Sequence, residues 1–129
     1  MDSIFSKIIS REISAYIISE NDHFIAFLDV FPIAKGHTLV IPKKQVDYIF
    51  DLDDETYTKL WEFAKNISAK VNSAIDCKRV GVAVIGLEVP HAHIHLVPLN
   101  SVEDINFSSP KLVLDKSEFV EIHKRIINA

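Results

Sequence analysis

The chain has 129 residues, the length of one domain, and its 48% hydrophobic and 25% charged content is typical of a soluble globular protein. A net charge of −4 gives no electrostatic reason to bind a nucleic acid polymer, and no apolar run reaches the roughly 18 residues of a membrane span. The single cysteine, Cys77, excludes an internal disulfide and fits a reducing compartment. Because residues 1–7 also lack the apolar core of a signal peptide, we expect a cytoplasmic protein with one domain, residues 1–129.

The first third of the chain predicts a short helix and a hairpin. Helical spacing near the N-terminus predicts one or two turns, formed by Ile4, Phe5, Ile8 and Ile9. Residues 15–19 and 23–29 are rich in β-forming residues and flank the turn-forming residues 20–22, which predicts an antiparallel hairpin whose side chains from residue 24 to 29 alternate between two faces. Asp29 ends the second strand, where an aspartate either starts a turn or holds a ligand hydroxyl.

A third strand and one long helix follow. Residues 36–44 predict a short strand stopped by proline, and His37 at its start is more often exposed when judged by position alone. Residues 53–75 predict the long helix, with Asp53 as its N-cap. Its apolar stripe is explained by core packing. The stripe consists of Tyr57, Leu60, Trp61, Ala64, Ile67, Val71, Ala74 and Ile75.

A second hairpin contains the feature around which the chain is organised. Residues 80–85 predict a strand, and the loop 86–90 returns the chain into a stretch that alternates histidine with apolar residues. If this stretch is a strand, one face carries His91, His93 and His95 and the other packs on a core. The spacing leaves three interpretations open: a zinc site, a histidine nucleophile with orienting neighbours, or a solvent-facing polar stripe.

The C-terminal part predicts one more helix. Residues 99–111 look irregular. Asp115 and Glu118 form the pattern of a capping box for a helix over residues 116–127. His123 on that helix is expected at the surface.

Four blocks in order resemble the Hint-like branch of the histidine triad (HIT) family. The stretch His91-Ala92-His93-Ile94-His95-Leu96-Val97 is similar to the family's His-x-His-x-His signature, and residues 4–9, 27–30 and 35–44 are similar in order and spacing. The resemblance covers residues 2–98 and leaves a C-terminal extension of about 99–129. It implies an α+β fold, with a five-stranded antiparallel sheet, one long helix and short terminal helices. It also implies a homodimer.

The resemblance further implies hydrolysis or transfer at the α-phosphate of a purine nucleotide, through a nucleotidyl-histidine intermediate, as in a purine nucleoside phosphoramidase. By position, His93 matches the nucleophile, His91 and His95 orient it and contact phosphate or leaving group, and His37 lies near the α-phosphate. Asp29 matches the ribose-binding acid. The base pocket is matched by Ile4, Phe5, Ile8, Phe27 and Val30.

No cofactor or metal is expected from the same resemblance. Relatives with a zinc site carry N-terminal cysteines, and Ser3 and Ser6 stand at those positions here. The chain departs from the family pattern in the loop before the triad, where Leu87 replaces an amide and Glu88 replaces a hydroxyl. An arginine that often follows the triad's proline is Leu99.

Glu88 is therefore a candidate catalytic residue with a consequence for specificity. A carboxylate beside the scissile bond would repel a polyphosphate leaving group, so we expect phosphoramidates to be preferred over dinucleoside polyphosphates. A buried Glu88 could also give a proton to an amine leaving group. The alternative function is a nucleotide-binding dimeric scaffold with little catalysis.

Overall fold

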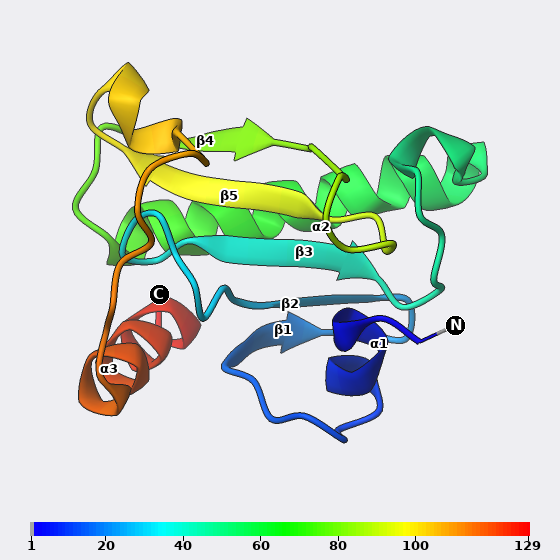
Figure 1. Ribbon diagram of the computed structural model, residues 1–129, viewed down its shortest axis with the longest axis horizontal. Coiled ribbons are helices and arrows are strands. Elements are labelled where there is room, and N and C mark those ends of the chain that lie inside the picture. Colours follow the sequence, from blue (N-terminus) through cyan, green and yellow to red (C-terminus); the bar gives the residue numbers. More distant parts are fainter. Residues whose placement is uncertain (1) are drawn as a thin grey trace.

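A five-stranded antiparallel sheet forms the centre of the structure, a computed structural model that describes residues 2–129 (Figure 1). The strand order is β1-β2-β3-β5-β4, and every neighbouring pair is antiparallel. The strands are β1 (Ile17–Glu20), β2 (Phe24–Leu28), β3 (Thr38–Pro42), β4 (Arg79–Ala83) and β5 (Ile94–Leu99). The predicted α+β fold is confirmed.

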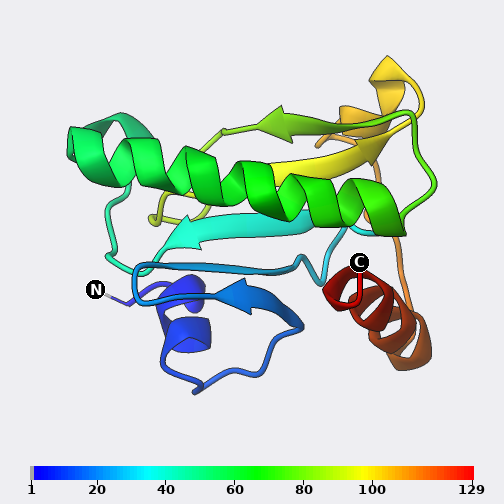
Figure 2. The same cartoon turned by 180° about the vertical axis from the view of Figure 1, so that it is seen from behind.

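Helix α2 (Asp54–Ala74) crosses one face of the sheet (Figure 2). Its start is fixed by Asp53, whose carboxylate accepts the N–H of Thr56 at 3.1 Å. The helix packs apolar residues against the inner faces of the strands, and each fully buried leucine or isoleucine side chain contributes about 1.5–3 kcal/mol. The buried residues of this contact include Leu60, Ala64, Ile67 and Val71 of α2 and Ala92, Ile94 and Leu96 beside them.

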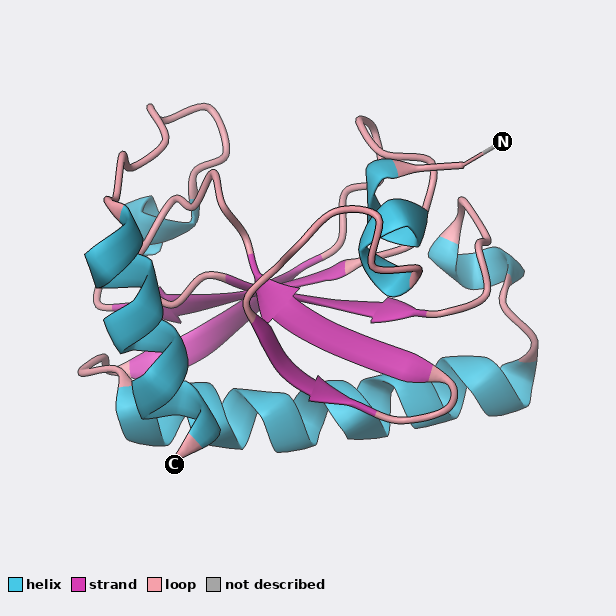
Figure 3. Cartoon of the chain, turned by 90° about the horizontal axis from the view of Figure 1, so that it is seen from below, coloured by secondary structure: helices cyan, strands magenta, loops and turns pink. Residues whose placement is uncertain are grey.

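The opposite face of the sheet carries helix α1 (Ile4–Ile9), as Figure 3 shows. Phe5 and Ile8 pack there in a second, smaller apolar cluster. The side chains of β2 alternate between the two clusters as predicted, and all five of its residues are buried because both faces are covered.

The histidine stretch folds differently from the prediction, because β5 begins only at Ile94 and the first two triad histidines precede it. Ile94 pairs with Val40, so two residues earlier Ala92 would come opposite Pro42, which has no N–H to give. The chain instead bonds elsewhere, and the N–H of Ala92 donates to the carbonyl of Val46 at 2.7 Å. Strand β4, its hairpin partner, is also shorter than the predicted 80–85.

Helix α3 (Lys116–Ile127) closes the chain beside β1, and its capping box of Asp115 and Glu118 is present as predicted. The expectation that His123 lies at the surface is wrong, because the ring is half-buried and its Nε2 donates to the carbonyl of Ile17 at 2.6 Å. That carbonyl belongs to the edge strand β1, whose register shifts between Ile17 and Ser19.

Two short 3₁₀ turns complete the structure. The first is η1 (Ile49–Asp51), and the second is η2 (Val102–Ile105), which interrupts the segment predicted to be irregular. Within residues 2–129, none of the helices is long and apolar enough to cross a membrane.

Candidate active site

A cavity of about 420 Å³ opens on the face of the sheet that carries α1. This size is in the range of small-molecule sites. Every predicted site residue except His91 lines it, and these residues are Ile4, Phe5, Ile8, Phe27, Asp29, Val30, His37, Glu88, His93 and His95. The structure therefore brings into one cavity residues from α1, the end of β2, the start of β3 and the histidine hairpin.

His91 lies behind the wall of the cavity and has both ring nitrogens bonded. Its Nε2 lies 2.7 Å from the carbonyl of Pro42, which can only accept, so Nε2 carries the proton. Its Nδ1 is therefore an acceptor and receives the hydroxyl of Ser3 at 3.2 Å. Ser3 is also the N-cap of α1, accepting the N–H of Ser6 at 3.0 Å. His91 thus joins the triad to the first helix.

His93 lines the cavity, and one hydrogen bond fixes the tautomer of its ring. Its Nδ1 lies 2.7 Å from the carbonyl of His91 and donates to it, so the lone pair of the neutral ring is on Nε2. Nε2 has no hydrogen bond to any residue in the range 2–129. The ring is held by Phe5, which meets it edge to face with centroids 5.0 Å apart. A fixed tautomer and a packed ring are what a nucleophile requires.

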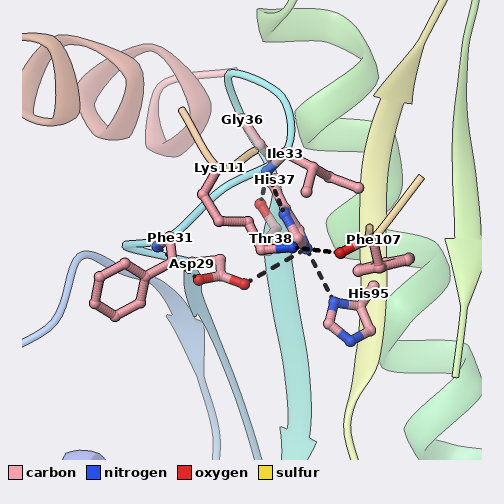
Figure 4. A network of polar contacts seen from close by, with 9 residues as sticks. All are labelled: Asp29, Phe31, Ile33, Gly36, His37, Thr38, His95, Phe107 and Lys111. Carbon is pink, nitrogen blue, oxygen red and sulfur yellow. Dashed lines mark hydrogen bonds and ion pairs between the residues drawn. The ribbon is translucent and has the colours of Figure 1, made fainter. Parts of the chain in front are cut away.

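His37 and His95 are linked in a chain of hydrogen bonds that starts at the backbone N–H of Ile33 (Figure 4). The N–H of Ile33 donates to His37 Nδ1 at 3.2 Å, so His37 carries its proton on Nε2. That Nε2 lies 2.9 Å from Nδ1 of His95, which therefore accepts and keeps its own proton on Nε2. Nε2 of His95 therefore carries an N–H, whereas Nε2 of the neutral His93 ring carries a lone pair.

Burial keeps both of these histidines uncharged. Burial, reinforced by the neighbouring His95, lowers the pKa of His37 to about 3. Burial also lowers the pKa of His95 to about 4, with smaller contributions from His93 and Lys111. The expectation from position alone, an exposed His37, is wrong, since only 2% of the residue is exposed.

Asp29 serves one of the two purposes that the sequence left open, because it starts a turn, and it also lines the cavity. Its Oδ1 accepts the N–H of Phe31 at 2.8 Å, which forms the turn after β2. Its Oδ2 lies 3.7 Å from Nε2 of His37, a contact that is not an ion pair because that ring is neutral. Burial raises the pKa of Asp29, while the Phe31 N–H opposes the rise.

The remaining cavity wall is an apolar slot under α1. Phe5 and Phe27 meet edge to face with centroids 5.6 Å apart and are buried. Ile4 and Val30 are about half exposed, at 49% and 47%, so they have apolar surface free to contact a ligand. A flat apolar ring fits such a slot because it would cover surface that now faces water.

Glu88 lies in the wall of the cavity but is exposed. The proton transfer from Glu88 was expected only for a buried carboxyl, and the exposed side chain does not meet that condition. Its charge still acts on the site, since it is one of the groups that raise the pKa of Asp29, although a minor one after burial.

Asp29, His37 and His95 are the one group within residues 2–129 whose potential ligand atoms converge as a metal site would need, within 4.8 Å of one another. The hydrogen-bond chain opposes metal binding, because His37 Nε2 carries a proton and the Nδ1 lone pair of His95 accepts it. At the N-terminus, the hydroxyls of Ser3 and Ser6 are both in hydrogen bonds, and zinc in proteins is bound by thiolate, imidazole or carboxylate.

Comparison with known proteins identifies the family. Residues 10–102 match the HIT domain. An uncharacterised HIT-like protein of Borreliella burgdorferi is 35% identical over 133 residues, which cover 97% of this chain and 96% of that protein. The chain belongs to the histidine triad (HIT) family.

Two further proteins are similar along nearly the whole of this chain. Adenosine 5′-monophosphoramidase HNT1 of Saccharomyces cerevisiae is 29% identical over 126 residues, covering 96% of this chain and 80% of that protein. The crystal structure of a Hit-like protein of Bartonella henselae, described as involved in cell-cycle regulation, superposes with a TM-score of 0.84 at 30% identity, covering 98% and 95% of the two chains.

Two residues that line the cavity lie beyond the HIT match and were missed by the sequence reasoning. Phe107 and Lys111 belong to the segment after η2 that was predicted to be irregular. The ring of Phe107 meets His95 with centroids 4.7 Å apart. Neither periodicity nor a motif marks these positions, so only the folded chain reveals them.

Proposed function

We propose that this HIT protein is a phosphoramidase-like nucleotide hydrolase that acts at the α-phosphate of a purine nucleotide in the cytoplasm. The observation that carries the proposal is the 2.7 Å hydrogen bond from His93 Nδ1 to the carbonyl of His91, which leaves the lone pair of the neutral ring on Nε2 in a residue that lines the 420 Å³ cavity. HIT proteins are generally hydrolases, and the name of the yeast relative gives the adenosine phosphoramidate as a candidate substrate.

The chemistry proceeds in two displacements. His93 Nε2 attacks phosphorus, a P–N bond to the ring forms, and the bond to the leaving amine breaks, with the amine taking a proton from water in the open cavity. Water then attacks the same phosphorus, loses its proton to solvent and releases the ring, giving a nucleoside monophosphate. The N–H on His95 Nε2 is a donor for a phosphate oxygen during both steps.

The nucleotide is held by the other side of the cavity. Phe5 and Phe27 with their apolar neighbours form the slot for the purine base. Asp29 Oδ2 is the acceptor for ribose hydroxyls, since Oδ1 is already bonded to the N–H of Phe31. His37 acts through His95, which it orients by the 2.9 Å hydrogen bond.

A covalent intermediate that depends on His93 tests the proposal. Purified protein is mixed with adenosine 5′-phosphoramidate, quenched in acid-free denaturant within milliseconds and examined by mass spectrometry for an adenylyl adduct on the His93 peptide. His93→Ala should lose the adduct and lower kcat by several orders of magnitude, whereas His23→Ala, which changes an exposed histidine in the β1–β2 turn, should retain both. Tight binding of AMP by wild-type protein without adduct or turnover would support the alternative, a nucleotide-binding scaffold.

We also propose that the protein is a homodimer. Strand β4 is an edge strand, and edges with exposed apolar side chains favour pairing with another chain. Exposed apolar residues at and near this edge are Val82, Val84, Ile85, Tyr48 and Phe50. Light scattering after gel filtration should give twice the mass of one chain. Val82→Lys should yield a monomer, and Val113→Lys, at a position 97% exposed outside this edge, should not.

A further inference from the structure

The segment between η2 and α3 returns to the cavity and is fastened there. The N–H of Leu112 donates to the carbonyl of Pro32 at 2.8 Å, which ties the segment to the loop that precedes His37. The ring of Phe107 packs against His95 and, with centroids 6.0 Å apart, against His37. The segment is therefore a wall of the site on the side of these two histidines.

Lys111 stands on this wall with its ammonium group held in place. Its Nζ donates to the carbonyl of Phe107 at 2.9 Å and lies 5.6 Å from the centroid of the Phe107 ring. An ammonium group has three N–H donors, so two remain for a ligand after the Phe107 bond. Figure 4 shows the side chain reaching over Asp29 toward His37.

Lys111 differs in charge from the other ionisable side chains that line the cavity. Two acidic side chains, Asp29 and Glu88, line the cavity, and Lys111 is the one lysine or arginine that does so among residues 2–129. His37 and His95 are held neutral by burial, so they supply hydrogen bonds but no positive charge. A phosphate brought between them and two carboxylates needs a cation to offset the repulsion.

We propose that Lys111 binds the phosphate of the bound nucleotide and makes the cavity select phosphorylated ligands over free nucleosides. This inference rests on the proposed function, because it assigns a residue to the phosphate of that substrate. The lysine comes from a segment outside the HIT match, which ends at residue 102. The positive charge is thus supplied from the C-terminal side of the chain.

The test compares AMP with adenosine, which share base and ribose and differ in the phosphate. Calorimetry at pH 7.5 measures both affinities for wild-type protein, Lys111→Met and Lys111→Arg. The matched control is Lys65→Met, which removes the same charge from an exposed position on α2, the helix on the far face of the sheet. Each measurement is repeated at low and high salt, because a charge contact weakens as salt is added.

Lys111→Met should weaken AMP binding about tenfold and leave adenosine binding within about twofold, as expected for loss of one charge-assisted hydrogen bond. It should also reduce the salt dependence of AMP binding, while Lys111→Arg and Lys65→Met remain close to wild type. Unchanged AMP affinity in Lys111→Met, or equal losses for AMP and adenosine, would overturn this inference and leave the proposed function intact. Wild-type protein that binds neither ligand would overturn both.

Discussion

Nε2 of His37 lies 2.9 Å from Nδ1 of His95, so the residue that precedes β3 fixes the proton position of a residue in β5. The partner on the other side, the N–H of Ile33, leaves only one neutral arrangement of the two rings. The arrangement ends in a donor on His95 beside the lone pair of His93. Under the proposed function, the nucleophile and the phosphate donor are thus oriented before any ligand enters.

Lowering the pH from 7 to 5 should destabilise the fold, because buried histidines are uncharged in it. Burial lowers the pKa of His37 to about 3 and that of His95 to about 4, and burial also lowers the pKa of His91, against an ordinary value of 6.5. As the pH falls below 6.5, these histidines bind protons in the unfolded chain but not in the native chain. The free energy of unfolding therefore decreases as the pH is lowered. Each ring contributes at most about 1.4 kcal/mol per pH unit.

Urea unfolding at pH 7, 6 and 5 measures this dependence. The loss should continue until the pH falls through the native pKa values, and the slope from these histidines should vanish about one pH unit above 6.5. His23→Ala, which removes an exposed histidine, serves as the control and should give a similar slope. Equal unfolding free energies at pH 7 and 5 would show that the three rings are not held neutral.

Ser3→Ala should destabilise the protein by about 2 kcal/mol or more, because one hydroxyl has two functions. It caps α1 through the N–H of Ser6 and bonds Nδ1 of the buried His91. The control is Ser10→Ala, whose exposed hydroxyl bonds only the carbonyl of Lys7 and should change stability by less than about 0.5 kcal/mol. Thermal or urea unfolding measures the stability of both variants. Equally small losses of stability in the two would contradict the assignment of both hydrogen bonds to the Ser3 hydroxyl.

Asp29→Asn should weaken binding of AMP more than binding of 2′-deoxy-AMP. The amide oxygen can replace Oδ1 as the acceptor for the N–H of Phe31, so the turn is kept. The amide nitrogen cannot accept a ribose hydroxyl, and loss of a hydrogen bond to a charged group corresponds to about tenfold or more in affinity. Calorimetry with both nucleotides measures the difference, and losses of equal size would assign Asp29 to the turn alone.

Glu88→Ser should narrow the preference for phosphoramidates over dinucleoside polyphosphates. Removing a negative charge from the cavity wall relieves repulsion of a polyphosphate leaving group and leaves an amine leaving group unaffected. Because Glu88 is exposed, solvent screens it, and we expect a severalfold change in the ratio of kcat/KM values. Glu121→Ser on α3 is the control, and an unchanged ratio in Glu88→Ser would make that residue an ordinary loop charge.

Helix boundaries were the most predictable features of this chain. Asp53 before α2 and the pair Asp115 and Glu118 before α3 bond to N–H groups within three residues, so local sequence contains the whole signal. The alternation of side chains along β2 between two apolar clusters was equally predictable, because successive side chains on a strand point to opposite faces.

Features that depend on distant partners could not be predicted. β5 starts where its continuation would meet Pro42, which is far upstream in the chain, and the place of His123 is set by a carbonyl of β1. The resemblance to HIT proteins predicted that His37 and Asp29 belong to the site, which their local sequence did not indicate. The resemblance does not extend to Phe107 and Lys111, whose positions depend on the path of an irregular segment.

The Ser3–His91 hydrogen bond also has a dynamic consequence. A helix of six residues is too short to be stable alone, so α1 persists through its cap and the packing of Phe5 on the sheet. Opening of α1 would break the bond to His91 and remove Phe5 from the wall of the cavity in the same event. Under the proposed function, a purine bound beside Phe5 would therefore stabilise α1 and slow the exchange of its amide protons with solvent.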